Sequence, residues 1–236
     1  MSTTSENKEE NAVTVSELPN VEQYLRSFGT LIRQFMPQQQ RVALAIYCEL
    51  ARGAPVDPHQ FGQTLGMSLE EVRTLFGGDP LKSFIHSDQQ GRILGFGGLS
   101  TVPTHHNFEV DGRALFAWCA GDTLFIPAYL GRQARVRSND PETGELVELT
   151  VGPDRVVSIT PESAVISFVD PESALFGTTA EQMMQSYCHF IFFFASRASG
   201  ERWVARHPGT FLYSIAEGFA FTKRASAMIF GPAPSE

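Results

Sequence analysis

Cys119 is followed within one helical turn by an acidic residue, a spacing at which a thiol and a carboxylate can act together. The chain has 236 residues and three cysteines. Cys119 ends a predicted strand, where the chain turns into a predicted helix. A thiol at a helix N-terminus feels the positive end of the helix dipole, which lowers the pKa of the thiol. Asp122 follows three residues later, so one helical turn brings its carboxylate over the Cys119 sulfur. The same pattern also fits a core cysteine followed by an aspartate that only caps the helix, and both interpretations are open.

The other two cysteines carry weaker signals. Cys48 lies in an apolar predicted helix, which indicates a small buried side chain. Cys188 opens an apolar run that is typical of a strand buried on both faces, so core packing is its simplest role. His189 follows it, but adjacent residues of a strand point to opposite faces, which argues against a Cys188–His189 dyad. The 69 positions (188 − 119) between Cys119 and Cys188 match no Cys-x-x-Cys metal knuckle.

Other candidate motifs are weaker still. His105 and His106 could be a metal pair, but a surface loop before a strand explains them more simply. The run Gly95-Phe-Gly-Gly98 lacks the strand–GxGxxG–helix context of a nucleotide-binding loop. No serine nucleophile elbow, HExxH motif or P-loop occurs in the sequence. A cysteine hydrolase is disfavoured because no histidine is placed to serve Cys119.

Composition limits the class of protein. The net charge is −8 and the pI is near 5.3, a balance that argues against a nucleic-acid-binding protein. Three cysteines cannot form a disulfide framework, so a reducing compartment is indicated. The first residues are polar and lack the apolar core of a secretory signal. The most apolar patch, 190–195, has six residues, whereas a membrane-spanning helix needs about 18 or more. We therefore expect a cytoplasmic protein without a membrane partner.

The N-terminal third divides into a polar tail and a helical module. Residues 1–20 carry one lysine and four glutamates and are predicted to be a flexible tail. Residues 21–97 show helical spacing followed by a hairpin pattern. Asp57 before Pro58 is an N-cap signal, and Ser68 with Glu71 forms a capping box. The predicted helices span residues 21–35, 42–50, 58–65 and 68–77, and the hairpin strands are 84–85 and 93–94.

This order of helices and hairpin is typical of a winged-helix module, whose last helix would read DNA. That helix offers Arg73 against Glu70 and Glu71. Residues 21–97 contain seven basic and seven acidic residues, so their net charge is zero. Since phosphate contacts dominate nucleic-acid affinity, we interpret the module as structural and expect no nucleic-acid partner.

Residues 98–236 are richer in strands, and the chain as a whole is predicted to be α+β. Short connections between the strands favour a mixed, mostly antiparallel sheet with flanking helices. The predicted strands are 107–110, 114–120, 134–138, 146–151, 156–159, 164–169 and 188–194. The predicted helices are 121–130, 196–206 and 215–229.

Two segments carry a resemblance to a known family. The run 107–136 (NFEVDGRALFAWCAGDTLFIPAYLGRQARV) closely resembles the core of the alkylmercury (organomercurial) lyases. The segment 185–196 (QSYCHFIFFFAS) is similar to that family's second cysteine segment, and Thr143-Gly144 and Trp203 also fit. The resemblance spans about residues 40–220. It implies a winged-helix-like module at 21–97 joined to a catalytic core at 98–236.

The resemblance also implies a catalytic trio. The family's two cysteines and aspartate match Cys119, Cys188 and Asp122, which would also hold the mercury. Two departures occur at positions where some members carry a further cysteine: this chain has Asp140 before the Thr-Gly turn and His189 after the second cysteine. Neither position belongs to the trio.

The implied reaction is protonolytic cleavage of a carbon–mercury bond, giving a hydrocarbon and Hg(II). Soft Hg(II) prefers thiolates, and a carboxyl group in an apolar pocket has a raised pKa and can supply the proton. No cofactor is implied beyond the mercury of the substrate. External thiols, or a mercuric reductase, would accept Hg(II), and a disulfide between Cys119 and Cys188 would be inactive. The alternative is a mercury-binding or other metal-binding regulator with a DNA-binding winged helix, although binding alone has no use for the proton donor Asp122.

Overall fold

The computed structural model describes residues 25–26, 34–170 and 179–234. The tail predicted at 1–20 and most of the helix predicted at 21–35 lie outside the described residues. No helix in the described part of the chain is long and apolar enough to cross a membrane.

The helices predicted at 58–65 and 68–77 begin at their capping signals, whereas the helix predicted at 42–50 begins five residues earlier (42 − 37), so its predicted start is wrong. α2 starts at a proline, Pro37, which needs no hydrogen-bond donor in the first turn. The Asp57 side chain accepts the N–H groups of His59 and Gln60, and Ser68 forms its capping box with Glu71. The N-terminal helices are α2 (Pro37–Leu50), α3 (Pro58–Leu65) and α4 (Leu69–Gly77), followed by the 3₁₀ helix η2 (Leu81–Phe84).

The predicted hairpin is confirmed, and it opens a large antiparallel sheet. Eight strands lie in the order β1-β2-β3-β5-β4-β6-β7-β8, and every pairing recorded among the described residues is antiparallel. The strands are β1 (Ile85–Ser87), β2 (Ile93–Phe96), β3 (Leu99–Ser100), β4 (His106–Val110), β5 (Arg113–Ala117), β6 (Ala134–Asn139), β7 (Leu146–Val151) and β8 (Val156–Thr160). Residues 97 and 98, where the predicted module ends and the predicted core begins, form the turn between β2 and β3, so strands from both sides of this boundary belong to one sheet.

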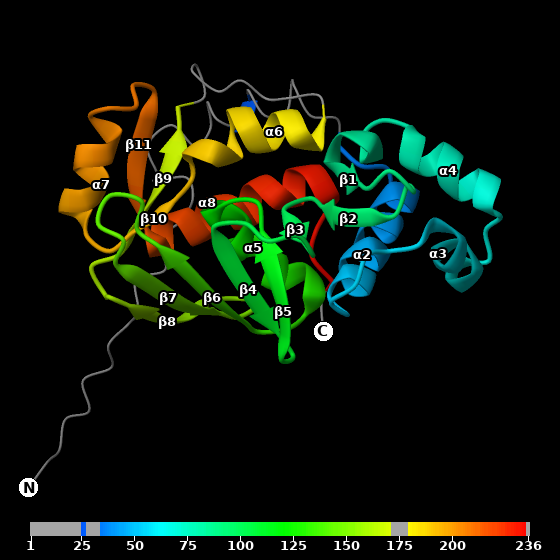
Figure 1. Ribbon diagram of the computed structural model, residues 1–236, viewed down its shortest axis with the longest axis horizontal. Coiled ribbons are helices and arrows are strands. Elements are labelled where there is room, and N and C mark those ends of the chain that lie inside the picture. The colour runs from blue at the N-terminus through cyan, green and yellow to red at the C-terminus, as the bar shows by residue number, and fades with distance from the viewer. Residues whose placement is uncertain (1–24, 27–33, 171–178, 235–236) are drawn as a thin grey trace, which may run out of the picture.

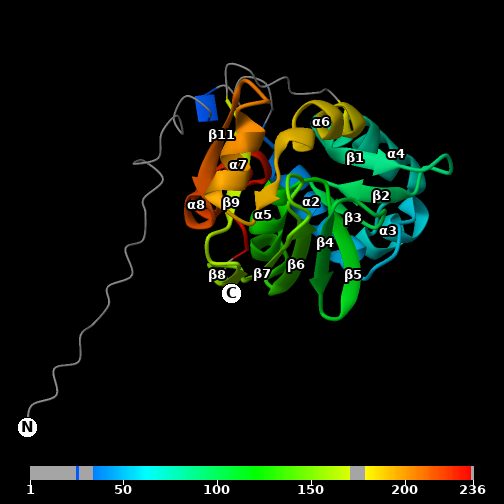
Figure 2. The same ribbon diagram turned by 60° about the vertical axis from the view of Figure 1, so that its left-hand side comes forward.

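A second, smaller sheet forms the other end of the molecule (Figures 1 and 2). It has three strands in the order β10-β9-β11, again antiparallel. Its strands are β9 (Val165–Val169), β10 (Phe193–Phe194) and β11 (Thr210–Ser214), and the helices of this half are α6 (Ala180–Ser186), α7 (Arg197–Val204) and α8 (Ile215–Phe230). The predicted α+β class with antiparallel strands is therefore confirmed.

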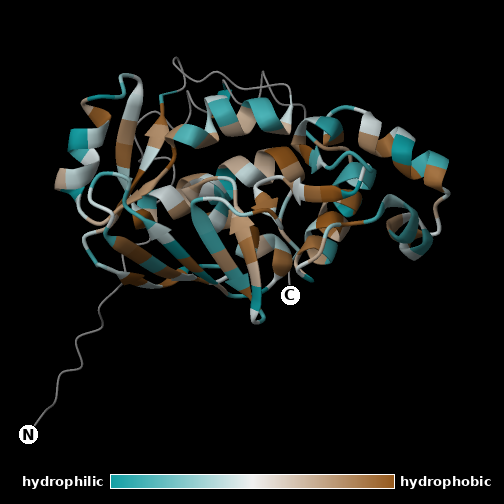
Figure 3. Cartoon of the chain, viewed as in Figure 1, coloured by the Kyte–Doolittle hydropathy of each residue, from teal (hydrophilic) through white to brown (hydrophobic). Residues whose placement is uncertain are grey.

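The core lies around α5 (Ala120–Leu130), which packs against α8 and α2. Nine of the eleven residues of α5 are buried, so the helix is covered on every side. α2 and α8 meet in the interior, where the rings of Tyr47 and Phe230 lie 5.9 Å apart. Hydrophobic residues gather on both of these helices (Figure 3). The element that carries Cys119 and Asp122 at its start is thus fixed by tertiary packing.

Two predictions about burial and strand structure are wrong. Cys48 is exposed, because α2 turns Ile46, Tyr47 and Leu50 towards the core and leaves Cys48 on another face. The strand predicted at 188–194 is instead a 3₁₀ helix, η3 (Cys188–Phe190), followed by the two-residue strand β10. A short apolar run has the same pattern in a buried strand and in other buried backbone, so periodicity cannot separate them.

His106 also departs from the prediction of a surface loop. It begins β4 and is 2% exposed, with its Nδ1 atom 2.8 Å from the hydroxyl of Ser138 and its ring beside Phe192 and Phe193. Burial, together with the charge of His105, lowers the pKa of His106 to about 3. The imidazole is therefore neutral in the folded protein at neutral pH.

We expect this buried histidine to weaken the fold in acid. The unfolded chain binds a proton on His106 below pH ~6.5, whereas the folded chain does so only near pH 3. The free energy of unfolding therefore falls as pH drops through this window, since the unfolded state binds more protons. Urea unfolding of wild type and of His106→Asn at pH 7 and pH 5 measures the effect. The destabilising change at the lower pH should be smaller in His106→Asn than in the control His59→Asn, which alters an exposed histidine.

Candidate active site

Cys119 occupies the N-cap of α5 and shares a reciprocal pair of hydrogen bonds with Asp122. The Cys119 N–H donates to Oδ2 of Asp122 at 2.9 Å, and the sulfur accepts the N–H of Asp122. Such a capping box fixes both side chains relative to the helix axis. The two interpretations of Asp122 that the sequence leaves open are therefore not exclusive, because Asp122 caps the helix and also places its carboxyl group at the sulfur.

Cys188 reaches the same point from a distant part of the chain. It begins η3, which follows α6, and the segment is attached to α5 by a hydrogen bond from the Ala120 N–H to the Ile191 carbonyl, 3.1 Å long. The sulfur atoms of Cys119 and Cys188 and one carboxylate oxygen of Asp122 all lie within 4.8 Å of one another. The two cysteines are only 2% and 5% exposed. The structure thus brings together the three residues that the resemblance implied.

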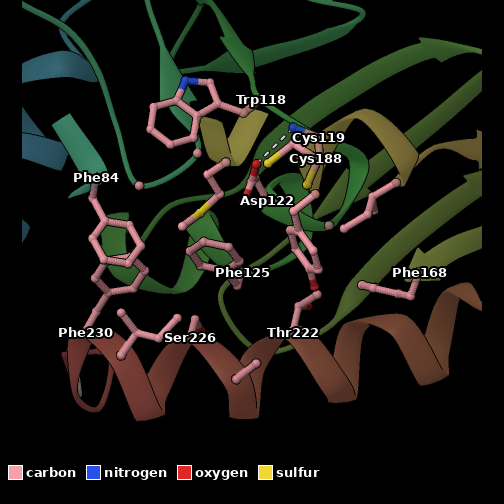
Figure 4. A pocket seen from close by; sticks show the side chains of 18 of the residues that line it. Phe84, Trp118, Cys119, Asp122, Phe125, Phe168, Cys188, Thr222, Ser226 and Phe230 are labelled. Atoms are coloured by element: carbon pink, nitrogen blue, oxygen red, sulfur yellow. Dashed lines mark hydrogen bonds between the residues drawn. The ribbon is translucent and has the colours of Figure 1, made fainter. Parts of the chain in front are cut away.

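The trio lies at one side of an apolar pocket of about 70 Å³ (Figure 4). α8 forms its floor with Thr222, Ser226 and Phe230, while Trp118 and Phe84 lie at its edge. Most of the other lining side chains are apolar or aromatic: Phe125, Phe168, Met183, Tyr187, Ile191, Phe221, Ala225 and Ile229. The pocket therefore offers a dry surface for an apolar group next to two sulfur atoms.

Burial shifts the pKa of Asp122 upwards to about 7, against the hydrogen bonds from Cys119 that lower it. Asp122 retains some exposed surface, but the pocket that it lines is apolar. At neutral pH both the acid and the carboxylate are populated, so this group can accept a proton and later donate it. The raised pKa expected for a carboxyl group in an apolar pocket is confirmed.

The pKa of Cys119, expected to be low, is instead raised well above its usual value. Burial is the largest cause, followed by the hydrogen bond with Cys188 and the negative charge of Asp122. These effects outweigh the helix dipole, which lowers the pKa of the thiol but typically contributes only about 0.3–1 kcal/mol at a helix terminus. The hydrogen bond with Cys119 lowers the pKa of Cys188, but burial and the charge of Asp122 have the larger combined effect, so the pKa of Cys188 is raised. Both thiols therefore rest in the protonated form and need a base.

Sequence comparisons place the chain among known proteins. The family model described as alkylmercury lyase matches residues 99–226. An alkylmercury lyase of Staphylococcus epidermidis is 37% identical over 178 residues, which cover 75% of this chain and 78% of the relative. That of Pseudomonas putida is 34% identical over 208 residues, covering 88% and 86%. The chain belongs to the alkylmercury lyase family. A solved structure, the mercury-bound form of MerB2, shares this fold with a TM-score of 0.67 at 22% identity, over 86% of this chain and 95% of that one.

Two positions at which some alkylmercury lyases carry cysteine lie outside the pocket lining. Asp140 is 1% exposed and accepts hydrogen bonds from the Ala195 N–H at 2.9 Å and the Ser199 hydroxyl at 2.7 Å. Its carboxylate thereby ties the turn after β6 to the start of α7. His189 is exposed and packs its ring near Phe190. Asp140 has a structural role, and exposed Cys48 lies apart from the trio.

Sequence reasoning missed the pocket residues that come from other elements. Phe84 belongs to the N-terminal helices, yet it lines the pocket together with Met183 of α6. Gly98 packs against the carboxyl group of Asp122. The pair Gly97-Gly98 between two apolar segments is a hairpin signal, so the turn itself was predictable, whereas its contact with Asp122 was not.

Proposed function

We propose that the protein is an organomercurial lyase that cleaves the carbon–mercury bond of its substrate by protonolysis. The observation that carries the proposal is the trio of two buried cysteines, Cys119 and Cys188, and the half-buried Asp122, with ligand atoms within 4.8 Å of one another, beside an apolar pocket. Membership of the alkylmercury lyase family supports it.

Substrate binding uses the two sulfur atoms and the apolar pocket. Mercury in R–Hg–X is a soft metal centre, and thiolates are its preferred ligands. One thiol displaces X, its proton leaving as HX, and forms a sulfur–mercury bond. The organic group R then lies among the aromatic side chains, where it loses contact with water. Organomercurials with an apolar organic group are therefore the substrate class.

Asp122 then moves a single proton from sulfur to carbon. As the carboxylate it accepts the proton of the second thiol, whose sulfur becomes a second ligand of mercury. Two thiolates raise the electron density on mercury, and the electron pair of the carbon–mercury bond passes to carbon. Asp122 donates its proton to that carbon, so R–H leaves and the carboxylate is restored. Oδ2 accepts the Cys119 N–H, so Oδ1 is the oxygen that carries the proton.

The reaction is balanced without a redox step. One R–Hg–X and two thiols give one R–H, one HX and a Hg(II) ion held by the sulfurs of Cys119 and Cys188. Mercury is Hg(II) throughout, and no step uses a further cofactor. External thiols release the product by exchange, with two thiol molecules taking Hg(II) and returning both protons to the cysteines. A mercuric reductase is a further acceptor in mercury resistance, and cytoplasmic thiols suit the required reduced state.

We also propose that residues 21–97 are a winged-helix-like scaffold for a core at 98–236. The net charge of zero in 21–97 disfavours the alternative of a DNA-binding mercury regulator. Phe84 contributes to the pocket, which gives the module a role in the site. The described hairpin strands continue into the main sheet, as expected of a module built into the fold.

The direct test is benzene release from phenylmercuric acetate. Purified protein with excess thiol should release one benzene and one Hg(II) per phenylmercury, over many turnovers. Gas chromatography measures benzene, and the thiol alone gives the uncatalysed rate. Folded protein that binds phenylmercury but releases no benzene above that rate would leave the regulator as the better proposal.

A further inference from the structure

The carboxyl group of Asp122 packs against a backbone turn that the reaction described above does not use. Gly97 and Gly98 are the two-residue turn between β2 and β3, with φ values of +50° and +100°. Glycine adopts such angles without the steric cost that side chains impose. A Cβ atom at Gly98 would lie 2.6 Å from Oδ1 and 2.7 Å from Cβ of Asp122, closer than real side chains approach. The absence of a side chain at Gly98 therefore makes room for the proton donor.

The turn is held in place by three hydrogen bonds. The hydroxyl of Tyr47 donates to the Gly97 carbonyl at 2.7 Å, and the Gly97 N–H donates to the Phe84 carbonyl at 3.0 Å. The N–H of Trp118, the residue before Cys119, donates to the Gly98 carbonyl at 2.8 Å. The turn is thus attached both to the N-terminal helices and to the strand end that leads to the catalytic cysteine.

Tyr47 is a rigid anchor for this turn. It is fully buried in α2, and its ring packs edge-on against Phe96, with 5.2 Å between ring centroids, and stacks on Tyr129 at 5.8 Å. Burial, followed by the charges of Tyr129 and Asp122, raises the pKa of Tyr47 well above its usual value, so the hydroxyl keeps its proton. A neutral, immobile phenol is a permanent hydrogen-bond donor to Gly97.

Each of the two oxygens of Asp122 is therefore constrained by a different element. Oδ2 accepts the Cys119 N–H, and Oδ1 lies 2.6 Å from the position that a Cβ atom at Gly98 would take. We propose that Gly98 is a positioning residue, which fixes the Asp122 carboxyl group for proton transfer to carbon, and that Tyr47 holds Gly98 in that place. This inference rests on the proposed lyase function, and it gives α2 a part in the reaction.

The test compares Gly98→Ala with Gly91→Ala. Gly91 also has a positive φ, +77°, but a Cβ there meets nothing within 4 Å, so this control introduces a side chain at positive φ without a collision. For Gly98→Ala we expect phenylmercury to bind with nearly unchanged KM, while kcat for benzene release falls by ~100-fold, as a misplacement of about 1 Å can cause. Gly91→Ala should match wild type. Equal kcat in the two variants would overturn the proposal, and so would a raised KM with unchanged kcat, which would indicate a blocked pocket.

A double-mutant cycle shows whether Gly98 acts through Asp122. In an Asp122→Gly background neither the carboxyl group nor the Cβ atom that a methyl group at Gly98 would meet is present, so adding Gly98→Ala should cause no further loss of kcat. A further loss of similar size would mean that the methyl group acts elsewhere, and the proposal would be wrong. Wild type without benzene release would instead overturn the lyase function itself, so the two failures are distinguishable.

Tyr47→Phe keeps the test decisive even if Gly98→Ala does not fold. It removes only the hydroxyl that binds Gly97, and we expect kcat to fall by about tenfold with little change in KM. Tyr129→Phe is the matched control, since it also removes one buried hydrogen bond from a tyrosine hydroxyl to a backbone carbonyl, that of Gly231 at 2.8 Å. Equal kcat in these two variants would show that Tyr47 has no positioning role.

Discussion

Cys119→Ser and Cys188→Ser should each reduce benzene release from phenylmercuric acetate below detection, a loss of at least ~10³-fold of the kind seen when a group bonded to the reacting atom is removed. A serine hydroxyl is a hard, weakly acidic ligand and does not replace a thiolate on Hg(II). One remaining sulfur still binds R–Hg, but it cannot weaken the carbon–mercury bond as two thiolates do. The structure supports this pairing, because both sulfurs are buried and lie within 4.8 Å of each other.

The control for this prediction is built into the chain. Cys48 is the third cysteine and is exposed on α2, so Cys48→Ser should keep wild-type turnover. When the Cys119→Ser and Cys188→Ser variants are each made in a Cys48→Ser background, so that no exposed thiol competes, mass spectrometry after one equivalent of phenylmercuric acetate should find one bound phenylmercury without benzene release. A Cys119→Ser enzyme that still turns over would contradict the two-thiolate mechanism. Loss of turnover in Cys48→Ser would assign that exposed thiol a role that its position does not suggest.

The local part of this site was predictable from the sequence. Two pairs of residues lie three positions apart, within one helical turn, and this separation can be read from the sequence. They are Ser68 with Glu71, which form a capping box, and Cys119 with Asp122 in the site. Strand β7 and helix α8 follow the hydrophobic period and lie within one residue of their predicted bounds. Such features depend on neighbours in the chain, so pattern alone is enough.

The remaining features depend on contacts between distant residues. Spacing gave no reason to bring Cys188 to Cys119, and only the family resemblance paired them. Cys188 was expected on a strand, but it begins the 3₁₀ helix η3. The Ser167 hydroxyl stabilises the backbone after Cys188, because it donates to the Phe190 carbonyl and accepts the Phe192 N–H. The spacing predicted the Asp122 carboxylate next to the Cys119 sulfur, but not Cys119 as the N-cap residue. The direction of the Cys119 pKa shift was also not predicted, because burial depends on how α5 and α8 pack.

The role of Gly98 shows the same limit. A glycine pair between apolar segments predicts a turn, yet the contact with Asp122 joins residues 24 positions apart (122 − 98) on different elements. Tyr47 is further still, at 50 positions from Gly97. Both would appear from sequence as an ordinary hairpin and an ordinary core tyrosine. Cys119 and Asp122 can thus be identified from a local motif and Cys188 from the family resemblance, whereas the residues that position them require the fold.

Asp122→Asn separates mercury binding from carbon protonation. The amide has the shape of the carboxyl group, and its oxygen can still accept the Cys119 N–H, so the capping box and both sulfurs stay in place. It has no acidic proton to give, and the loss of a general acid typically costs ~10²–10⁴-fold in rate. We therefore expect stoichiometric binding of phenylmercury, followed by benzene release slowed by this factor in a single-turnover measurement.

The pH dependence gives a second readout of the same variant. With a pKa of about 7, the fraction of ionised Asp122, the form that takes the proton of the second thiol, falls as pH drops through neutrality, so wild-type benzene release from the bound complex should decline below pH ~7. In Asp122→Asn this decline should vanish, because the group that titrates is gone. Asp57→Asn is the matched control, since Asp57 also caps a helix, α3, and accepts two backbone N–H groups, but it lies outside the pocket. It should keep both the rate and the decline, so a wild-type pH profile in Asp122→Asn would assign the proton to another donor.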